Sequence, residues 1–125
     1  MMWVVVFLGV AGAGAVEVPV IDGPVKIEQA EKLLADGVQV LDVRTKEEWD
    51  AGRLKGAIRV DFLEEGFLTK AVAALDPKKP LLVYCRSGNR SEKAAKILRD
   101  GGFSAVYEMT GGIVAWEAAG KPVQR

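Results

Sequence analysis

Residues 80–100 read PLLVYCRSGNRSEKAAKILRD. An apolar run up to Tyr84, a polar loop with a glycine, and a segment with apolar positions at helical spacing predict a buried strand, a turn and a helix. Where such a helix begins, several backbone N–H groups lack partners and can converge on an anion. Cys85, the only cysteine of the 125 residues, opens this loop. We therefore expect the chemistry of the protein here.

The side chains around Cys85 favour its thiolate. A free thiol has a pKa of about 8.5, and helix N-termini and neighbouring guanidinium groups lower it, so Arg86 and Arg90 are expected to do so here. Gly88 permits the positive φ of a tight cradle. The other loop residues carry small side chains that donate or accept hydrogen bonds: Ser87, Asn89 and Ser91. A lone cysteine is often only a small core residue, but this polar setting does not describe a core.

Composition excludes several functional classes. The chain has 17 basic and 17 acidic residues and no histidine. Zero net charge gives no reason to expect nucleic acid as a partner. Without histidine, Cys–His and Ser–His catalysis and the commoner zinc sites are excluded, and we expect neither a metal nor a cofactor. With one cysteine there is no internal disulfide, so sulfur bound to Cys85 must pass to an external molecule.

The N-terminal segment resembles a secretory signal. Residues 1–16 have no charged side chain, and an apolar stretch is followed by Ala-Gly-Ala-Gly-Ala at residues 11–15. Cleavage is expected after Ala13 or Ala15, so residues 1–15 would be a signal peptide and the mature protein periplasmic or secreted, without stable membrane insertion. The segment lacks the usual basic residues. An uncleaved membrane anchor, or a misassigned start and a cytoplasmic protein, are the alternatives.

Strand and helix patterns alternate beyond this segment. Residues 16–24 read as an extended lead-in, and the domain is expected to begin near Val25. Strands are predicted over 38–43, 57–60, 80–84 and 104–108, and helices over 27–34, 45–51, 62–75 with a break or shift at Gly66, 92–100 and 113–119. Thr45 and Glu48 form the signature of a capping box. This order predicts one α/β domain with a small parallel sheet of four to five strands and helices on both faces.

Ligands of parallel sheets bind beyond the carboxyl ends of the strands, which here hold Asp42, Asp61, Cys85 and Met109. A carboxylate facing an anionic substrate would repel it. Asp42 and Asp61 are therefore expected to support Arg86 or Arg90, or to serve only in a turn.

Two further motifs have a structural reading. The spacing of Trp49 and Trp116 predicts packing in or near the core. Gly111 and Gly112 precede a helix, where turn geometry is the expected role and anion binding the alternative.

Five segments together resemble a known family: residues 41–44 (LDVR), 48–49 (EW), 52–57 (GRLKGA), the Cys85 loop and 111–116 (GGIVAW). In this order they are similar to single-domain rhodaneses, and the likeness covers residues 25–123. Where the family usually has His-Ile, this chain has Arg53-Leu54. We carry no function onto Arg53 beyond a pair with Glu47 or Glu48.

The resemblance implies a sulfurtransferase. Cys85 would take a sulfane sulfur from a donor such as thiosulfate, become a persulfide, and pass the sulfur to cyanide or a thiol, including the cysteine of a partner protein. Residues Arg86 to Ser91 would bind substrate, with backbone amides on the persulfide and Arg86 and Arg90 on the sulfonate of the donor.

Two other functions remain open. Phosphatases and arsenate reductases of this fold have five residues between cysteine and arginine, whereas this chain has four, residues 86–89. The shorter loop makes a smaller cradle, and no residue is obviously placed as a leaving-group acid. A persulfide carrier or sensor loaded by a partner protein would share the same sequence and differ in its rate with small donors.

Overall fold

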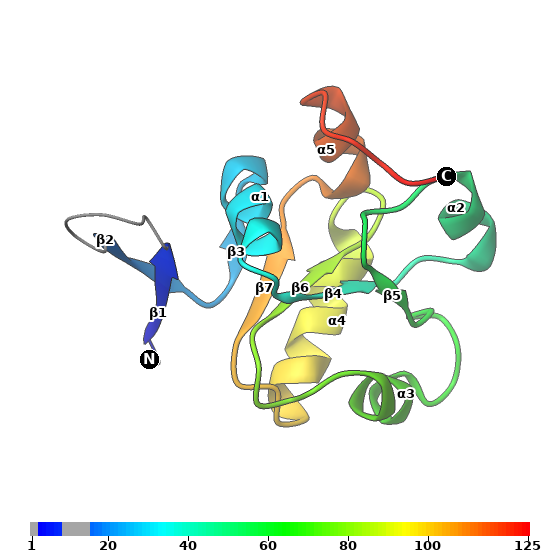
Figure 1. Cartoon of the computed structure of the whole chain (residues 1–125). Helices are drawn as coiled ribbons and strands as arrows, with labels where there is room; N and C mark the ends of the chain where they lie inside the picture. Colours follow the sequence, from blue (N-terminus) through cyan, green and yellow to red (C-terminus); the bar gives the residue numbers. More distant parts are fainter. Residues whose placement is uncertain (1–2, 9–15) are drawn as a thin grey trace.

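The computed structural model describes residues 3–8 and 16–125. Its main body is a parallel sheet of five strands in the order β3-β7-β6-β4-β5 (Figure 1). These strands are β3 (Pro24–Val25), β4 (Gln39–Asp42), β5 (Ile58–Arg59), β6 (Leu81–Tyr84) and β7 (Val106–Met109). The helices are α1 (Ile27–Ala35), α2 (Lys46–Ala51), α3 (Phe67–Ala74), α4 (Asn89–Asp100) and α5 (Gly112–Ala118). The predicted α/β architecture and strand number are confirmed.

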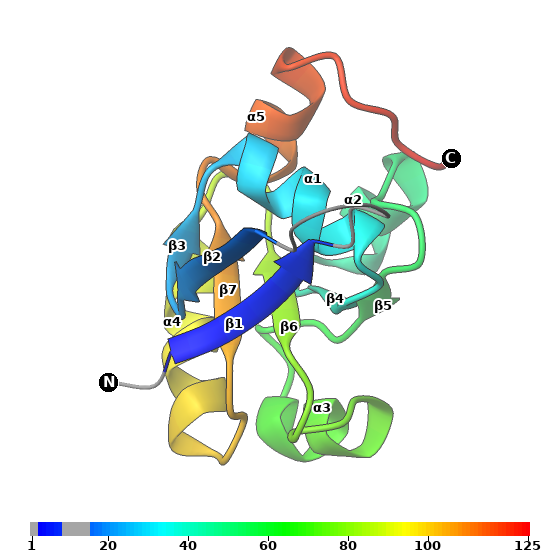
Figure 2. The same cartoon turned by 60° about the vertical axis from the view of Figure 1, so that its left-hand side comes forward.

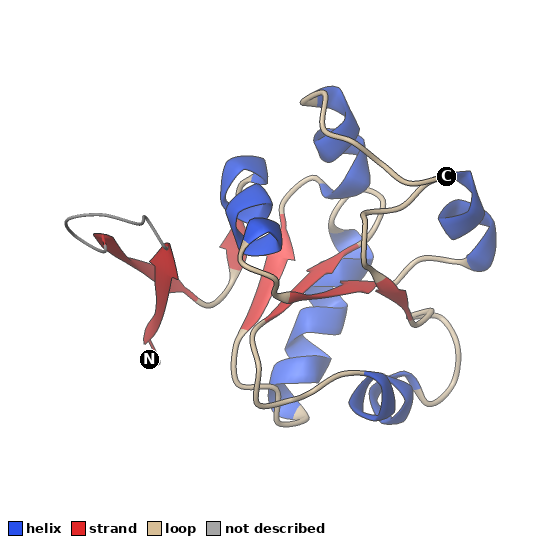
Figure 3. Cartoon of the chain, in the orientation of Figure 1, coloured by secondary structure: helices blue, strands red, loops and turns tan. Residues whose placement is uncertain are grey.

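Strand β6 lies at the centre of the sheet. All four of its residues are apolar and buried, as a central strand that is covered on both faces requires. Side chains alternate along a strand, so Leu81 and Val83 face one side and Leu82 and Tyr84 the other. The first pair packs in a core that includes residues of α3 and α4, and the second in a core that includes residues of α1 and α5. Figure 3 shows these helices on either side of the sheet. The end of β6 is thus fixed from both faces.

Local signals set most helix ends. Thr45 Oγ1 accepts a 3.3 Å hydrogen bond from the Glu48 amide, and Glu48 Oε1 accepts one of 3.2 Å from the Thr45 amide, which confirms the capping box. The helix predicted over 62–75 with a break or shift at Gly66 begins only beyond that glycine, because Gly66 takes a φ of +75° and is the N-cap of α3. Residues 62–66 are therefore not helical. Phe62 instead packs edge-on against Phe67, with ring centroids 5.3 Å apart.

An antiparallel hairpin precedes the main sheet. Strand β1 (Trp3–Leu8) pairs with β2 (Val16–Ile21) as a separate two-stranded sheet (Figure 2), which the sequence analysis did not predict. Strand β2 lies within the predicted lead-in. Ala13 and Ala15, the predicted cleavage positions, fall outside the described residues, so the signal peptide stays a prediction. None of the helices in the described ranges is both long and apolar enough to cross a bilayer.

Candidate active site

Cys85 follows the last residue of β6, and the loop after it turns back over the sulfur. The Cys85 side chain is almost fully buried. Its Sγ accepts a 3.1 Å hydrogen bond from the Gly88 amide and lies 3.4 Å from the Ser91 hydroxyl. Gly88 has a φ of +113°, a conformation that favours glycine, and it caps α4. The loop therefore brings a backbone N–H donor and a side-chain hydroxyl to one sulfur atom.

Hydrogen bonds determine the protonation of this thiol. Burial by itself raises the pKa of Cys85. The Ser91 hydroxyl and the backbone amides of Ser91, Gly88 and Ser87 together lower it by more than burial raises it, so the pKa lies below its ordinary value. The charge of Arg90 also interacts with that of Cys85, in the direction expected from the sequence. The hydrogen bonds to Sγ are nevertheless the leading contributions that favour the thiolate.

The first turn of α5 is hydrogen-bonded to the start of the Cys85 loop. The Ile113 amide donates a 3.0 Å hydrogen bond to the Cys85 carbonyl, and the Val114 amide donates one of 3.1 Å to the Arg86 carbonyl. Gly111 and Gly112 have φ values of +80° and +61°, as tight turn geometry demands. These two amides of the α5 N-terminus thus hold carbonyl groups of the loop.

Arg90 turns toward α2. Its Nη1 and Nη2 donate hydrogen bonds of 2.7 and 2.9 Å to the two carboxylate oxygens of Glu48. The hydrogen bond from Arg90 is the main reason that the pKa of Glu48 falls to about 2, with smaller contributions from Thr45. This pair was not predicted from the sequence, which suggested Arg53 as a partner for Glu47 or Glu48. Arg86 is exposed and forms no ion pair with the described residues.

Asp42 does not support either loop arginine. It is fully buried and pairs with Arg44 at 2.7 Å, while the Tyr84 hydroxyl donates a 2.6 Å hydrogen bond to it. The β4–β6 register places Asp42 beside Tyr84, which explains the partner. The expected support of a loop arginine by Asp42 is therefore wrong, whereas a turn contact is present, because Asp42 Oδ1 accepts a 2.9 Å hydrogen bond from the Arg44 amide. Asp61 accepts a 2.9 Å hydrogen bond from the Leu63 amide, which is a turn contact.

The Arg53 segment joins α2 to the end of the chain. Arg53 stacks on the Trp49 ring at 4.8 Å instead of pairing with Glu47 or Glu48, and its backbone pairs with Gln124. Trp116 is buried in the core on the α1 and α5 side, as predicted. Trp49 belongs to neither core and is only half-buried.

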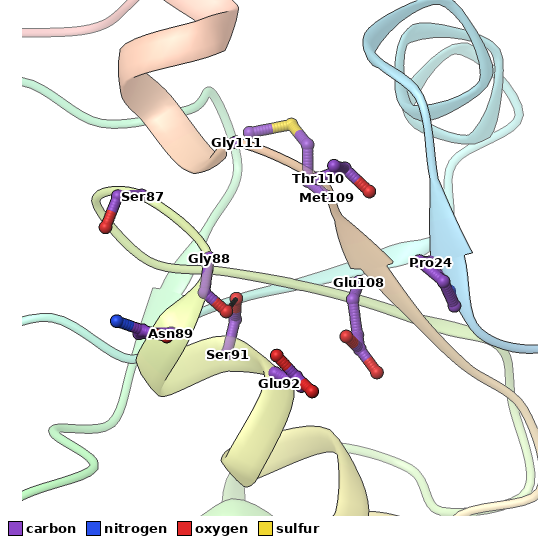
Figure 4. Close-up of a pocket in the computed structure, with 10 residues that line it drawn as sticks. All are labelled: Pro24, Ser87, Gly88, Asn89, Ser91, Glu92, Glu108, Met109, Thr110 and Gly111. Carbon is purple, nitrogen blue, oxygen red and sulfur yellow. Dashed lines mark hydrogen bonds between the residues drawn. The ribbon is translucent and has the colours of Figure 1, made fainter.

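A cavity of about 490 Å³ opens beside the loop on its β7 side (Figure 4). Four predicted substrate residues line it: Ser87, Gly88, Asn89 and Ser91. Glu92 and Glu108 line it too, and Glu108 accepts a 3.2 Å hydrogen bond from Arg99. Cys85 is not in the wall, but Gly88 and Ser91 touch both its sulfur and the cavity.

The loop was predicted from the sequence, but the residue that pairs with Arg90 was not. That residue, Glu48, lies 42 residues before Arg90, and only the capping box indicated that its side chain is held in place.

Among the residues that the structure describes, no three His, Cys, Asp or Glu side chains gather as a metal site would require.

Comparisons with known proteins identify a family and several relatives. A family model described as a rhodanese-like domain matches residues 26–119. The chain is 35% identical over 109 residues to thiosulfate sulfurtransferase 16, chloroplastic, of Arabidopsis thaliana, which covers 80% of this chain and 91% of that protein. It is 35% identical over 91 residues to thiosulfate sulfurtransferase GlpE of Pseudomonas paraeruginosa, with 73% and 80% covered.

Solved structures show the same architecture. The rhodanese-like domain of an Anabaena sp. protein superposes with a TM-score of 0.73 at 26% identity, over 83% of this chain and 80% of that one. A rhodanese-related protein from Thermoplasma volcanium gives a TM-score of 0.71 at 28% identity, over 81% and 96%.

Proposed function

The chain belongs to the rhodanese-like domain family and is a rhodanese-type sulfurtransferase, and on this premise we propose that it transfers a sulfane sulfur through a persulfide on Cys85. The donor would be a small sulfur-containing anion such as thiosulfate, and the acceptor a thiol or cyanide. The convergence of the Gly88 amide and the Ser91 hydroxyl on Cys85 Sγ carries this proposal.

In the first half-reaction the Cys85 thiolate attacks the outer sulfur of thiosulfate. A bond forms between Sγ and that sulfur as the bond from the outer sulfur to the sulfonate sulfur breaks. The electron pair leaves with sulfite, and Cys85 keeps an anionic persulfide. The step needs no proton, so the absence of histidine from the chain does not prevent it.

In the second half-reaction an acceptor thiolate attacks the terminal sulfur of the persulfide. The sulfur–sulfur bond to Cys85 breaks, its electron pair returns to Sγ, and the acceptor leaves as a persulfide. Cyanide would leave as thiocyanate in the same way. The thiolate regenerated is the form that the loop donors favour.

The loop supports the negative charge in both steps. Hydrogen bonds from fixed backbone amides stabilise an anion without rearranging when the charge moves by one sulfur atom. In the thiol form, Cys85 faces the Ser91 hydroxyl while that hydroxyl donates a 3.1 Å hydrogen bond to the Gly88 carbonyl. In the thiolate form the same hydroxyl can turn its proton to the sulfur.

The two loop arginines are not equivalent for a donor. Arg86 is exposed and makes no ion pair with the described residues, whereas Arg90 is engaged by Glu48. We assign the first contact with the sulfonate of a donor to Arg86. The cavity beside the loop has room for a small thiol acceptor, with polar side chains over much of its wall.

Mass spectrometry of the intact chain tests the proposal. With thiosulfate, the wild type should gain one sulfur, and cyanide should remove it. Cys85→Ser should gain none while keeping its circular dichroism spectrum and melting temperature. If a folded wild type with a titratable thiolate gains no sulfur from thiosulfate or another sulfane donor, the small-molecule transferase is wrong. Loading only by a partner protein would instead identify a carrier.

Export is a separate proposal that rests on residues 1–15 alone. Sequencing the N-terminus of the protein recovered from cell fractions tests it. A chain that starts at Gly14 or Val16 in the periplasmic fraction would support cleavage. A chain that starts at residue 1 in the cytoplasm would overturn it. Cleavage after Ala15 would also remove β1, the partner of β2.

A further inference from the structure

The ion pair with Glu48 occupies N–H donors of the Arg90 guanidinium that an anionic ligand would otherwise use. Nη1 and Nη2 each donate to a different oxygen of the same carboxylate, at 2.7 and 2.9 Å. An arginine binds a planar anion best through two parallel N–H groups. Because Glu48 already occupies this bidentate face, a sulfonate can reach it only by displacing the carboxylate.

Glu48 is held in this position by its own helix. Its Oε1 accepts hydrogen bonds from the Thr45 amide at 3.2 Å and the Thr45 hydroxyl at 3.1 Å. The side chains of Glu48 and Arg90 are each 24% exposed, so the pair is partly shielded from water and salt. The carboxylate is therefore a fixed partner of Arg90 and not a passing surface contact.

This arrangement lowers the positive charge that Cys85 experiences. Arg90 has a raised pKa, first through its hydrogen bond with Glu48, and the charges of Cys85 and Asp61 also contribute. The Arg90 charge thus acts on the sulfur, but the Glu48 charge beside it offsets the effect at longer range. What remains for an incoming anion is the loop amides and Arg86.

We propose that Glu48 is a specificity-determining positioning residue, which competes with anionic ligands for Arg90 and sets how strongly the site favours them. The role within sulfur transfer rests on the proposed function. The electrostatic part does not, because any anion that approaches Cys85 Sγ should respond to it. Replacing Glu48 by a neutral side chain should therefore make the site more selective for anions.

The first test uses two alkylating reagents that share one reaction and differ in charge, iodoacetate and iodoacetamide. Cys85 is the only cysteine, so the mass gained by the chain reports this residue alone. The variant is Glu48→Gln, since glutamine can also serve as the third helical residue of a capping box. The matched control is Glu47→Gln, which removes the same charge from the exposed neighbour on α2.

We expect Glu48→Gln to raise the ratio of the iodoacetate to the iodoacetamide rate by roughly threefold to tenfold, because the variant removes a negative charge beside the site and frees the Arg90 guanidinium for the anionic reagent. Glu47→Gln should leave the ratio within about twofold, because its charge is screened. A merely structural role for Glu48 would change both rates together and leave the ratio unchanged. That result would overturn the proposal, as would a fall in the ratio.

Arg90 must carry the effect. In Glu48→Gln/Arg90→Gln the ratio should return toward that of the wild type, because both charges of the pair are gone. Arg90→Gln alone should lower the ratio, because it leaves the Glu48 carboxylate unpaired near the site. If Glu48→Gln raised the ratio equally with and without Arg90, competition for Arg90 would be wrong.

Steady-state kinetics with thiosulfate test whether Glu48 has the same effect on an anionic donor during turnover. Glu48→Gln should lower KM by roughly threefold to tenfold and change kcat little, because the freed guanidinium binds the donor before reaction. If the wild type takes no sulfur from thiosulfate, the proposed function fails while the alkylation ratio still decides the role of Glu48. If sulfur is transferred but the alkylation ratio stays fixed, only the inference about Glu48 fails.

Discussion

Gly112 lies against the backbone of Cys85. A Cβ on Gly112 would come 2.5 Å from the Cys85 carbonyl oxygen and closer still to that of Arg86. Backbone atoms cannot move aside as the end of a side chain can. The absence of a side chain at the start of α5 is therefore what lets this helix hold the loop that carries Cys85, the proposed nucleophile.

Gly112→Ala should damage both stability and activity. It combines a positive φ with a backbone clash, so we expect a loss of about 3 kcal/mol or more in the free energy of unfolding. Urea denaturation and sulfur transfer from thiosulfate measure the two effects. Gly120→Ala is the control, because its φ is +74° but nothing lies within 4 Å of the added Cβ. It should lose only about 1–2 kcal/mol. Equal losses would argue against the contact.

Ser91→Ala should raise the pKa of Cys85. The Ser91 hydroxyl is the first of the groups that favour the thiolate, and its loss leaves the backbone amides to oppose burial. The pH dependence of iodoacetamide alkylation should shift to higher pH, and alkylation at neutral pH should slow. Ser87→Ala removes a hydroxyl but keeps the Ser87 amide, so its profile should match the wild type. A shift of the same size in both variants would refute the role of the hydroxyl.

Glu48 should make the chain more stable near neutral pH than in acid. Its pKa in the folded chain is about 2, below the ordinary value of 4.5. The ionised group therefore stabilises the fold above pH 4.5, and this contribution is lost as the pH falls toward 2. Because the side chain is partly exposed, we expect the wild type to exceed Glu48→Gln by on the order of 1 kcal/mol near neutrality. Denaturation across the acid range should show the gap closing, and a constant gap would contradict it.

The buried pair of Asp42 and Arg44 should be essential for stability. Asp42→Asn leaves the Arg44 charge buried without its counter-ion, which costs about 3–5 kcal/mol. Thermal and urea unfolding measure this loss. Asp50→Asn breaks the exposed pair with Lys46 and should change stability by less than about 1 kcal/mol. If Asp42→Asn were equally mild, the buried pair would not be essential for stability.

Local signals were enough for much of the fold. The capping residues Thr45 and Glu48, the alternation of apolar strands with amphipathic helices, and the break at Gly66 each act over a few residues, and a sequence displays them directly. The two-residue strand β3 and the β1–β2 hairpin were missed. A pair such as Pro24–Val25 is too short for any periodic pattern.

The partners of charged residues could not be predicted in this way. Asp42 was correctly placed at a strand end, but the β4–β6 register sets it beside Tyr84. Arg90 meets Glu48 because α2 follows the carboxyl end of β4, while α4 begins beyond the carboxyl end of β6, the neighbouring strand in the sheet. Which side chains meet across this edge depends on sheet order and register, and neither is encoded near Arg90 or Asp42.

The buried strand β6 and the loop after it differ in what holds their backbone. In β6, the backbone is hydrogen-bonded to a strand on each side, β4 and β7. At Gly88 the amide instead donates a hydrogen bond to a sulfur atom whose charge would change in the proposed reaction. Hydrogen exchange should therefore be slowest in residues 82–84, and protection at Gly88 should follow the oxidation and loading state of Cys85. Within residues 81–91, hydrogen exchange of the strand amides would then report global unfolding, and exchange of the Gly88 amide would report the state of Cys85.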